Sequence, residues 1–591
     1  MKKLYFLIIG LLLLTIVNSQ TIVTSGNVSG NWTLSNSPYI IQGDIIIPDS
    51  QLLVIEPGVR VEFEGYYGLN VFGKLSSIGN NIDTIVFTSA DTTGIYLNDS
   101  LGRWKGILID MESNIDTTII DYSSIQYTFA KFDTSDNWLN FIGAINICEY
   151  NNVVISNSYI SDNFLNNMTQ FVTMGAIMAT NCNPTIVSNI ITNNINYSGL
   201  NINNCLNSIV KGNEISYNTS ISGAGIYLFS SLSSIEDNFI HHNHACGDVT
   251  GGGGIKVYLC QNVNTQIKNN KITFNSAEEA GAGIYFNNSK GSITGNLIAN
   301  NYTFEGSCGF SDGGGGIFVS QTYNNSLLIQ NNIIVNNNSD HDGGGLKFVR
   351  SKVTVSNNVI SNNTSNSFGG GIGLLEDSSS FYNNIITQNY KNNIHENLSF
   401  FGTADSTTWR NNLFDTLSVN RVDTITSIID TLNCIVANPE FILPSAGAGV
   451  GYDGASGYWN VFTTSVAINN GIIDTTGLNL ILVDYANNSR IQGGRIDIGA
   501  YESLIVNIKD NIGKNETLIY PNPTTGKLII VSDKTIEQVN ITDINGKTVY
   551  TTSLRGTKQS ISLDLSKQAK GIYFVKLIGD GFVSVQKLVL E

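Results

Sequence analysis

A short repeated phrase in the middle of this chain constrains its fold more than any other feature. The phrase opens with an apolar residue and carries two asparagines, separated by apolar or mixed residues and then polar ones, as in residues 186–194. Further copies occupy residues 209–218, 235–243, 267–275, 293–301, 329–337, 355–363 and 381–389. The first asparagines of successive copies (189, 213, 238, 270, 296, 332, 358 and 384) are 24 to 36 residues apart. A period in this range is typical of solenoids, in which each repeat forms one turn.

A run of glycines before a short alternating segment completes most repeats. Three glycines precede Ile255-Lys-Val-Tyr258, and three more precede Leu346-Lys-Phe-Val349. Alternation with period two is typical of a strand with one face inward, and no stretch keeps a helical period. Two or three short strands per turn, stacked at about 4.8 Å per turn, form a parallel β-helix. We therefore predict an all-β chain with a β-helix solenoid over residues 20–436.

Asparagine and glycine suit the bends between these strands. Asparagine tolerates the left-handed backbone region and bonds its own main chain, while glycine allows positive φ where the chain re-enters the sheet. Asparagine amides stacked in register are expected to form side-chain ladders from turn to turn. Aligned apolar residues are expected to fill a narrow core, with one internal column made by Ile226, Ile255, Ile284 and Ile317.

The pattern resembles the right-handed parallel β-helix family, which includes pectate-lyase-like enzymes and many secreted repeat proteins. The resemblance covers roughly residues 40–435 and rests on the repeat shape, with opening segments such as Leu53 to Gly58 and Trp104 to Ile107. It implies right-handed winding. Residues 437–503 break the repeat, and the string from Arg490 to Glu502 is similar to the terminal segment of bacterial surface proteins with choice-of-anchor domains. A C-terminal cap explains that string equally well and is the preferred interpretation, because a solenoid needs covered ends.

The first 19 residues are interpreted as a signal peptide. Lys2 and Lys3 precede an apolar run from Leu4 to Val17, and a small-residue cleavage site ends at Ser19. No later stretch reaches 18 apolar residues, so no transmembrane segment is expected after removal of the signal. The protein is therefore expected to be secreted or held on the outer cell surface.

Charge and cysteine content narrow the possible partners. The chain of 591 residues has 47 acidic and 31 basic side chains and a net charge of -16, which argues against nucleic acid as a partner. Its seven cysteines do not make the disulfide framework of a small secreted domain. Cys182, Cys205 and Cys260 are expected to be small buried hydrophobes in the core. Pairing of Cys246 with Cys308 is an alternative for two loop cysteines whose turns are not adjacent.

The C-terminal region carries a separate pattern. After a polar connector over residues 504–516, alternating strands are expected over residues 528–531, 539–544, 561–565, 572–577 and 583–590, which predicts a small antiparallel β-sandwich over 517–591. Tyr520-Pro-Asn-Pro523, Thr525-Gly526, Asp543 to Lys547, Lys570 to Tyr573 and Lys587 to Glu591 closely resemble the type A sorting domain of the Bacteroidetes type IX (Por) secretion system. The resemblance implies contact with that secretion machinery, usually followed by removal of the domain.

Two rows of side chains are candidates for ligand binding or chemistry on the solenoid. Strand alternation places one column outward: Tyr227, Lys256, Tyr285, Phe318 and Lys347, with Phe229 and Tyr258 two residues farther along their strands. Exposed aromatic rings and lysines in such a column would stack on sugar rings and bind hydroxyls or carboxylates. A covering loop, or simple strand propensity for aromatic residues, is the alternative.

Acidic loop residues before the glycine runs form the second row. They are Asp248, Glu278, Glu279, Glu305, Asp312, Asp340 and Asp342, with His341. Asp312, Asp340 and Asp342 are candidate glycosidase carboxylates, because carboxylates on neighbouring turns would be about 5–10 Å apart. Asp248, Glu278, Glu279 and Asp312 are candidate Ca²⁺ ligands, and acidic loops without function are the alternative. Lys256, Lys347 or Arg350 would be the base of a lyase.

Three histidines and a cysteine, His241, His242, His244 and Cys246, invite a zinc interpretation. The first two, however, fall at turn positions that hold Ser, Thr or Asn in other repeats, so a zinc site is not expected. The leading hypothesis is a surface β-helix protein that binds extracellular polysaccharide along its flank, with no cofactor except possible calcium. A polysaccharide lyase or glycoside hydrolase and a purely structural adhesin remain alternatives.

Overall fold

The computed structural model describes most of the chain after residue 19. The described ranges are 20–93, 103–110, 117–131, 143–149, 152–166, 173–247, 251–262, 264–305, 312–322, 326–401, 407–416, 419–421, 429–492, 494–503, 517–544, 546–579 and 582–591. The predicted signal peptide, the connector 504–516, Asp248 and Cys308 lie outside these residues. The chain divides into two compact units, residues 1–504 and 505–591.

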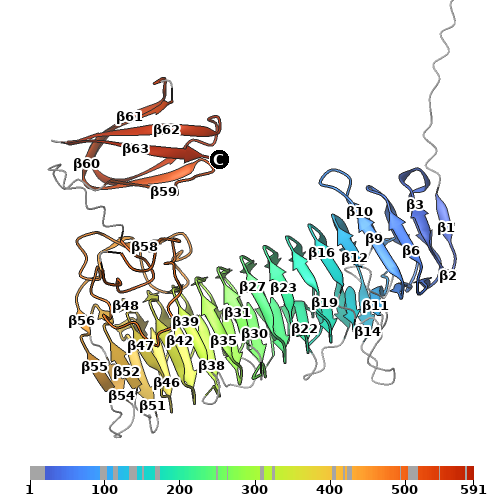
Figure 1. Ribbon diagram of the computed structural model, residues 1–591, viewed down its shortest axis with the longest axis horizontal. Helices are drawn as coiled ribbons and strands as arrows, with labels where there is room; N and C mark the ends of the chain where they lie inside the picture. The colour runs from blue at the N-terminus through green and yellow to red at the C-terminus, as the bar shows by residue number, and fades with distance from the viewer. Residues whose placement is uncertain are drawn as a thin grey trace, which may run out of the picture. The chain divides into compact units, whose positions relative to one another are not determined.

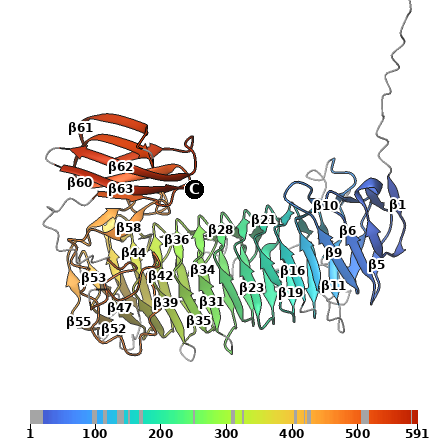
Figure 2. The same ribbon diagram turned by 45° about the horizontal axis from the view of Figure 1, so that its top comes forward.

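The first unit is a parallel β-helix built from three long sheets (Figures 1 and 2). The first sheet has 16 strands from β1 (Thr21–Val23) to β56 (Ile435–Val436). The second and third sheets have 15 strands each, from β2 (Gly26–Asn27) to β54 (Val419–Arg421) and from β3 (Gly30–Trp32) to β55 (Ile429–Leu432). One turn contributes β34 (Ile284–Asn287), β35 (Gly291–Thr294) and β36 (Leu297–Ala299) to the second, third and first sheets, and β37 (Tyr302–Thr303) to a smaller fourth sheet. The predicted all-β solenoid is confirmed.

Equivalent residues of successive turns lie above one another, as the repeat predicts. Ile226 pairs with Ile255, Ile255 with Ile284, and Ile284 with Ile317, and all four side chains are fully buried. The predicted internal column is therefore confirmed. Cys182, Cys205 and Cys260 are also buried, and the backbone N–H groups of Cys205 and Ser231 donate to Ser231 Oγ and Cys260 Sγ respectively. The cysteines thus substitute for serine in a file of polar bends.

The two asparagines of each phrase form two continuous buried ladders. In the first ladder, Asn270 Nδ2 donates to Asn296 Oδ1 at 3.0 Å and to the Ile235 carbonyl at 2.8 Å. The second ladder ends where Asn397 Nδ2 donates to Asp415 Oδ1 at 3.0 Å. Because each ladder amide donates to the side-chain oxygen of the ladder residue that follows it, a carboxylate is a suitable terminal acceptor. The ladders satisfy bend carbonyls that would otherwise be buried without partners.

Residues 437–503 lie along the side of the solenoid, on the outer face of the first sheet. Trp459 and Ile498 join Val359 and Ile385 in one apolar cluster, which also includes outward residues of β36 and β53 (Leu413–Phe414). The two strands of this segment are β57 (Phe441–Leu443) and β58 (Tyr458–Val461), and they pair antiparallel. The segment therefore covers the flank of several turns, which is a different place from the end that a cap would cover.

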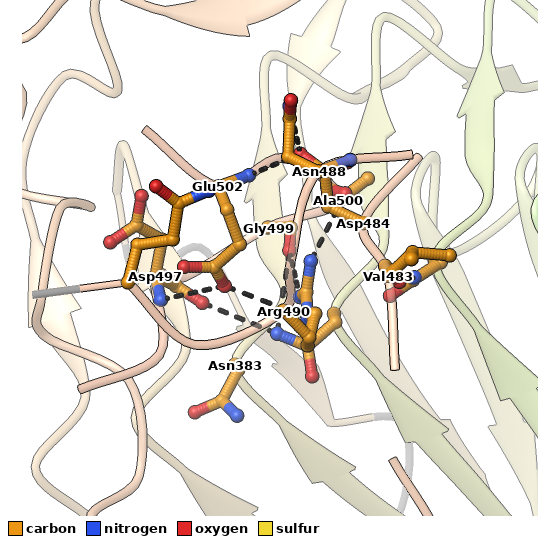
Figure 3. A network of polar contacts seen from close by, with 12 residues as sticks. Asn383, Val483, Asp484, Asn488, Arg490, Asp497, Gly499, Ala500 and Glu502 are labelled. Atoms are coloured by element: carbon orange, nitrogen blue, oxygen red, sulfur yellow. Dashed lines mark hydrogen bonds and ion pairs between the residues drawn. The ribbon is translucent and has the colours of Figure 1, made fainter. Parts of the chain in front are cut away.

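A buried polar network holds the end of this segment together (Figure 3). Arg490 donates to the Gly499 carbonyl at 2.8 Å, and its Nε lies 3.6 Å from Glu502 Oε1. Asp484 and Asp497 accept backbone N–H bonds from the same loop. Burial raises the pKa of Glu502 to about 8, although the charge of Arg490 opposes this effect. The string that resembles an anchor segment is thus a folded loop built around one guanidinium and three carboxyl groups.

The second unit is a five-stranded antiparallel sheet with its own apolar core. Its strands are β59 (Thr517–Tyr520), β60 (Lys527–Asp543), β61 (Thr548–Asp564), β62 (Gly571–Gly579) and β63 (Phe582–Leu590). Two strands predicted separately, 528–531 and 539–544, belong to the single long strand β60, whose pairing shifts register between Val531 and Ile536. Inward residues such as Tyr573, Val575 and Leu577 alternate with exposed ones, as predicted.

Candidate ligand-binding surface

The outward column predicted on the second sheet is aligned but largely covered. Tyr227 pairs with Lys256, Lys256 with Tyr285, Tyr285 with Phe318, and Phe318 with Lys347. Lys256, Phe318 and Lys347 are buried, whereas Tyr227 and Tyr285 are half-buried. The predicted alignment is confirmed, but the predicted exposure is wrong for the two lysines and the phenylalanine. Half-buried Phe229 and Tyr258 lie beside this column, with ring centroids 5.8 Å apart.

The glycine runs themselves cover the column. Gly252 has φ +88°, and a Cβ at this position would lie only 2.7 Å from Lys256 Cβ. A Cβ at Gly343, which has φ +63°, would lie 2.9 Å from Lys347 Cβ. Each run therefore folds back onto the outward residue of the strand that follows it, and only glycine allows so close an approach. The covering segment that the sequence left as an alternative is the preceding part of the same repeat.

Lys256 lies in a cage of aromatic rings. Its Nζ donates to Ser222 Oγ at 2.7 Å and lies 4.9 Å from the ring centre of Tyr285, 5.5 Å from that of Tyr258 and 5.7 Å from that of Tyr227. Burial lowers the pKa of Lys256 to about 8, with the charge of Glu279 opposing the change. The cage stabilises a buried ammonium from inside the protein, so this lysine is not displayed to a polymer.

Lys347 and Asp342 form a buried ion pair. Lys347 Nζ lies 2.7 Å from Asp342 Oδ2, and His341 Nδ1 lies 3.5 Å from the same oxygen. Burial alone would raise the pKa of Asp342, but the hydrogen bond from His341 and the charge of Lys347 outweigh it and lower the pKa. The general acid of a glycosidase needs a raised pKa, so the lowered pKa of Asp342 does not suit that role.

The rest of the acidic row is dispersed. Asp340 accepts from the Glu305 N–H at 3.1 Å and from Asn366 Nδ2 at 2.9 Å, while Asp312 is exposed and Glu278 and Glu279 are half-buried. Within the described ranges, no three His, Cys, Asp or Glu side chains gather closely enough to hold a metal ion. Calcium binding and catalysis by this row stay predictions.

The histidines considered for zinc belong instead to an aromatic surface. His242 follows β28 (Phe239–His241) at the bend into the fourth sheet, and its ring stacks between Tyr217 at 4.9 Å and Phe274 at 5.2 Å. Tyr217 is 51% exposed and Phe274 is 36% exposed. His241 Nδ1 lies 2.8 Å from His242 Nδ1, which is a hydrogen-bonding distance between the two rings. Sequence reasoning treated these positions as solvent-facing turns and missed the stack.

We call the file of residues at this bend the bend column: Tyr217, His242, Phe274, Asn300, Asn336 and Asn362, one from each successive turn. All six have φ between 54° and 58°. A non-glycine residue in this region costs about 1–3 kcal/mol, whereas a stacked ring pair stabilises by about 0.5–1.5 kcal/mol. Two stacked pairs therefore do not offset the strain of three aromatic residues, since asparagine would suit each position better. Positive φ also occurs at Tyr122, Leu259 and Arg350, so the three rings differ from the other bends in their stacking and exposure rather than in their backbone.

Comparisons with known proteins identify the C-terminal unit. Residues 518–591 match the family model described as a secretion system C-terminal sorting domain. The C-terminal unit is a sorting domain of this kind. The sorting domain directs export by the type IX secretion system, so the protein is secreted or attached at the outer surface. Within the described part of the chain, no helix is long and apolar enough to cross a membrane.

One curated relative matches a short part of the chain. A stretch of 85 residues is 34% identical to Protein bark beetle of Drosophila melanogaster. The stretch makes up 14% of this chain and 3% of that protein, so the chain spans a small fraction of the relative's length.

Proposed function

We propose that this exported β-helix protein binds an extended extracellular polysaccharide at the ring part of the bend column, Tyr217, His242 and Phe274. The observation that carries the proposal is a file of exposed aromatic rings kept in strained backbone on an otherwise asparagine-lined bend. The rings stack on one another, so the exposed surface that they offer is made of ring edges, which combine apolar carbon atoms with the Tyr217 hydroxyl. Such mixed edges suit sugars, which combine apolar C–H faces with hydroxyl groups.

Neighbouring rings extend this surface to the next bend. Tyr302 of β37 is 39% exposed, and Phe304 stacks on His244 at 5.6 Å. The register neighbours of Tyr302 are Ser276 and Asn338, so these added rings do not repeat from turn to turn. Tyr217, His242 and Phe274 do lie on three successive turns in register, and a polymer along the solenoid axis would meet a ring on each of them, which favours an extended ligand over a small molecule.

The test is a glycan-binding screen with matched variants. Tyr217→Asn and Phe274→Asn remove the rings but place at the bend the residue that Asn300 already shows to be accommodated there. Leu206→Asn is the control, because Leu206 is 63% exposed away from the bend column. We expect binding to fall in both ring variants and to persist in the control. Unchanged binding in both ring variants would place the site elsewhere on the solenoid.

Product analysis in the same screen tests the enzymatic alternative. A lyase would create unsaturated uronates, and a hydrolase would create new reducing ends. We expect neither product, because Lys347 is buried in an ion pair and Asp342 has a lowered pKa. Turnover that is lost in Asp312→Asn or Asp340→Asn would establish the enzyme instead.

A further inference from the structure

The bend column already binds another segment of the chain, made of bends and turns, over part of its length. Asn362 Nδ2 donates to Ser445 Oγ and to the Gly447 carbonyl, and Asn336 Nδ2 donates to the Gly447 and Gly449 carbonyls, at 2.8 to 3.0 Å. One turn farther toward the N-terminus, Asn300 donates to the Tyr452 carbonyl at 2.6 Å and accepts from the Gly454 N–H at 3.0 Å. Residues 445–454 thus run along the solenoid axis from Asn362 toward Asn300.

The ring part of the bend column continues, toward the N-terminus, the file of residues along which residues 445–454 lie. Asn300 lies one turn beyond Phe274 in the same file, and His242 and Tyr217 follow on the next two turns. The occupied part is lined by asparagine amides that bind peptide carbonyls, whereas the exposed part is lined by rings. Ring edges lack the amide groups with which these asparagines bind peptide carbonyls, so the exposed part is suited to a different kind of ligand.

We infer that the ring part of the bend column takes an uncharged polysaccharide chain that lies along the solenoid axis, in line with residues 445–454. The inference deepens the proposed function and rests on it. Axial alignment follows from residues 445–454, because this segment runs along the same file from Asn362 toward Asn300. The rings of Tyr217, His242 and Phe274 are 4.9 and 5.2 Å apart, so they span about 10 Å, or a few sugar residues.

The preference for an uncharged chain follows from the charges around the rings. Glu214 lies 3.4 Å from His241, and Lys271 Nζ lies 4.8 Å from the Phe239 ring centre, so this acid and this base of the first sheet each have a partner within the protein, although Lys271 is exposed. Burial lowers the pKa of His241 and of His242, which keeps both imidazoles neutral at pH 7.

The wider surface also disfavours a polyanion. Lys256 and Lys347, the lysines that would bind uronate carboxylates, are buried beneath the glycine runs. The net charge of -16 repels acidic polymers at low salt. At the outward column, the two lysines are therefore not available to bind a uronate polymer, and the negative charge of the protein repels such a polymer.

The experiment compares polymers that differ in charge alone. Full-length protein is tested by affinity electrophoresis against methyl-esterified homogalacturonan and the same polymer after de-esterification, together with neutral xylan, mannan and glucan and acidic alginate. We expect neutral polymers to bind at least about tenfold more tightly than acidic ones, with little dependence on salt. Equal or tighter binding of the acidic forms would overturn the inference but leave the proposed function standing. Failure to bind any polymer would overturn both.

An oligosaccharide series tests the axial orientation. With the best neutral polymer, affinity is expected to rise with length until the chain spans the three rings. Tyr217→Asn and Phe274→Asn, at the two ends of the stack, should each flatten that rise, while Leu206→Asn should keep it. A series in which only one end variant matters would show that the ligand does not follow the column.

Discussion

Removal of one ladder amide, by the substitution Asn270→Ala, should open the solenoid locally. Asn270 Oδ1 accepts from the backbone N–H and Nδ2 of Asn238, both at 2.9 Å, and its Nδ2 donates to Ile235 O and Asn296 Oδ1. Each hydrogen bond contributes about 1 kcal/mol net, so four lost bonds cost about 4 kcal/mol. The cost is large because the groups that lose these hydrogen bonds are buried.

The assay is native-state hydrogen exchange, because a solenoid this long need not unfold in one step. Amides of β31 (Thr265–Lys268) and β35 should exchange about a thousandfold faster, which is the factor that about 4 kcal/mol represents. The adjacent Asn269 is exposed at φ 54°, so Asn269→Gly keeps the bend and serves as the control. Equal exchange in the two variants would refute the view that the ladders stabilise the turns.

The remaining predictions concern buried charges, the end of a ladder and export. Lys256→Met should raise the free energy of unfolding at pH 7 by about 2 kcal/mol in denaturant titration. The reason is that lowering the pKa of Lys256 from 10.5 to about 8 costs about 3 kcal/mol, of which the hydrogen bond to Ser222 offsets about 1 kcal/mol. In the unsubstituted protein, the free energy of unfolding should rise between pH 8 and 10.5, because over this range Lys256 has lost its proton in the folded state but keeps it in the unfolded state. Because Glu502 has a folded pKa of about 8, above its ordinary 4.5, its contribution is complete below pH 4.5 and is lost as pH rises toward 8. Proteolysis of residues 437–503 should therefore be faster at pH 8.5 than at pH 5, and Glu502→Gln should remove the difference. Asp415→Leu should deprive Asn397 Nδ2 of one of its acceptors, leaving the Thr416 carbonyl, and lower the thermal stability of the last turns. An unchanged transition temperature would contradict the proposed role of that carboxylate. Deletion of residues 518–591 should leave the protein inside the cell envelope, as fractionation and immunoblotting would show.

The repeat was sufficient to predict the solenoid and its interior. Period-two alternation after each glycine run assigned Ile226 and its equivalents to the inside, because a strand points alternate side chains to opposite faces whatever surrounds it. The spacing of the asparagines likewise predicted amide ladders, since in-register stacking brings identical side chains within hydrogen-bond distance. The sorting domain was recognisable because its residues lie close together in the chain.

Exposure was the property that local patterns could not supply. Lys256 and Lys347 point away from the core as predicted, yet they are buried because the glycine run of the same turn folds back over them. The doubled asparagines at Asn300-Asn301, Asn336-Asn337 and Asn362-Asn363 look alike in the sequence. In each pair the second residue is a buried ladder member, and the first binds a segment more than 80 residues away.

The amino-acid sequence alone determined the parallel β-helix of the first unit and the identity of its interior columns, because both depend on residues one turn apart in a regular repeat. It also determined the sorting domain of the second unit, because the motifs of that domain are local in the chain. Tertiary structure decided which outward side chains meet solvent and what lies on the flank. Those outcomes depend on where residues 437–503 and the glycine runs pack, and packing between segments far apart in the chain follows no repeat.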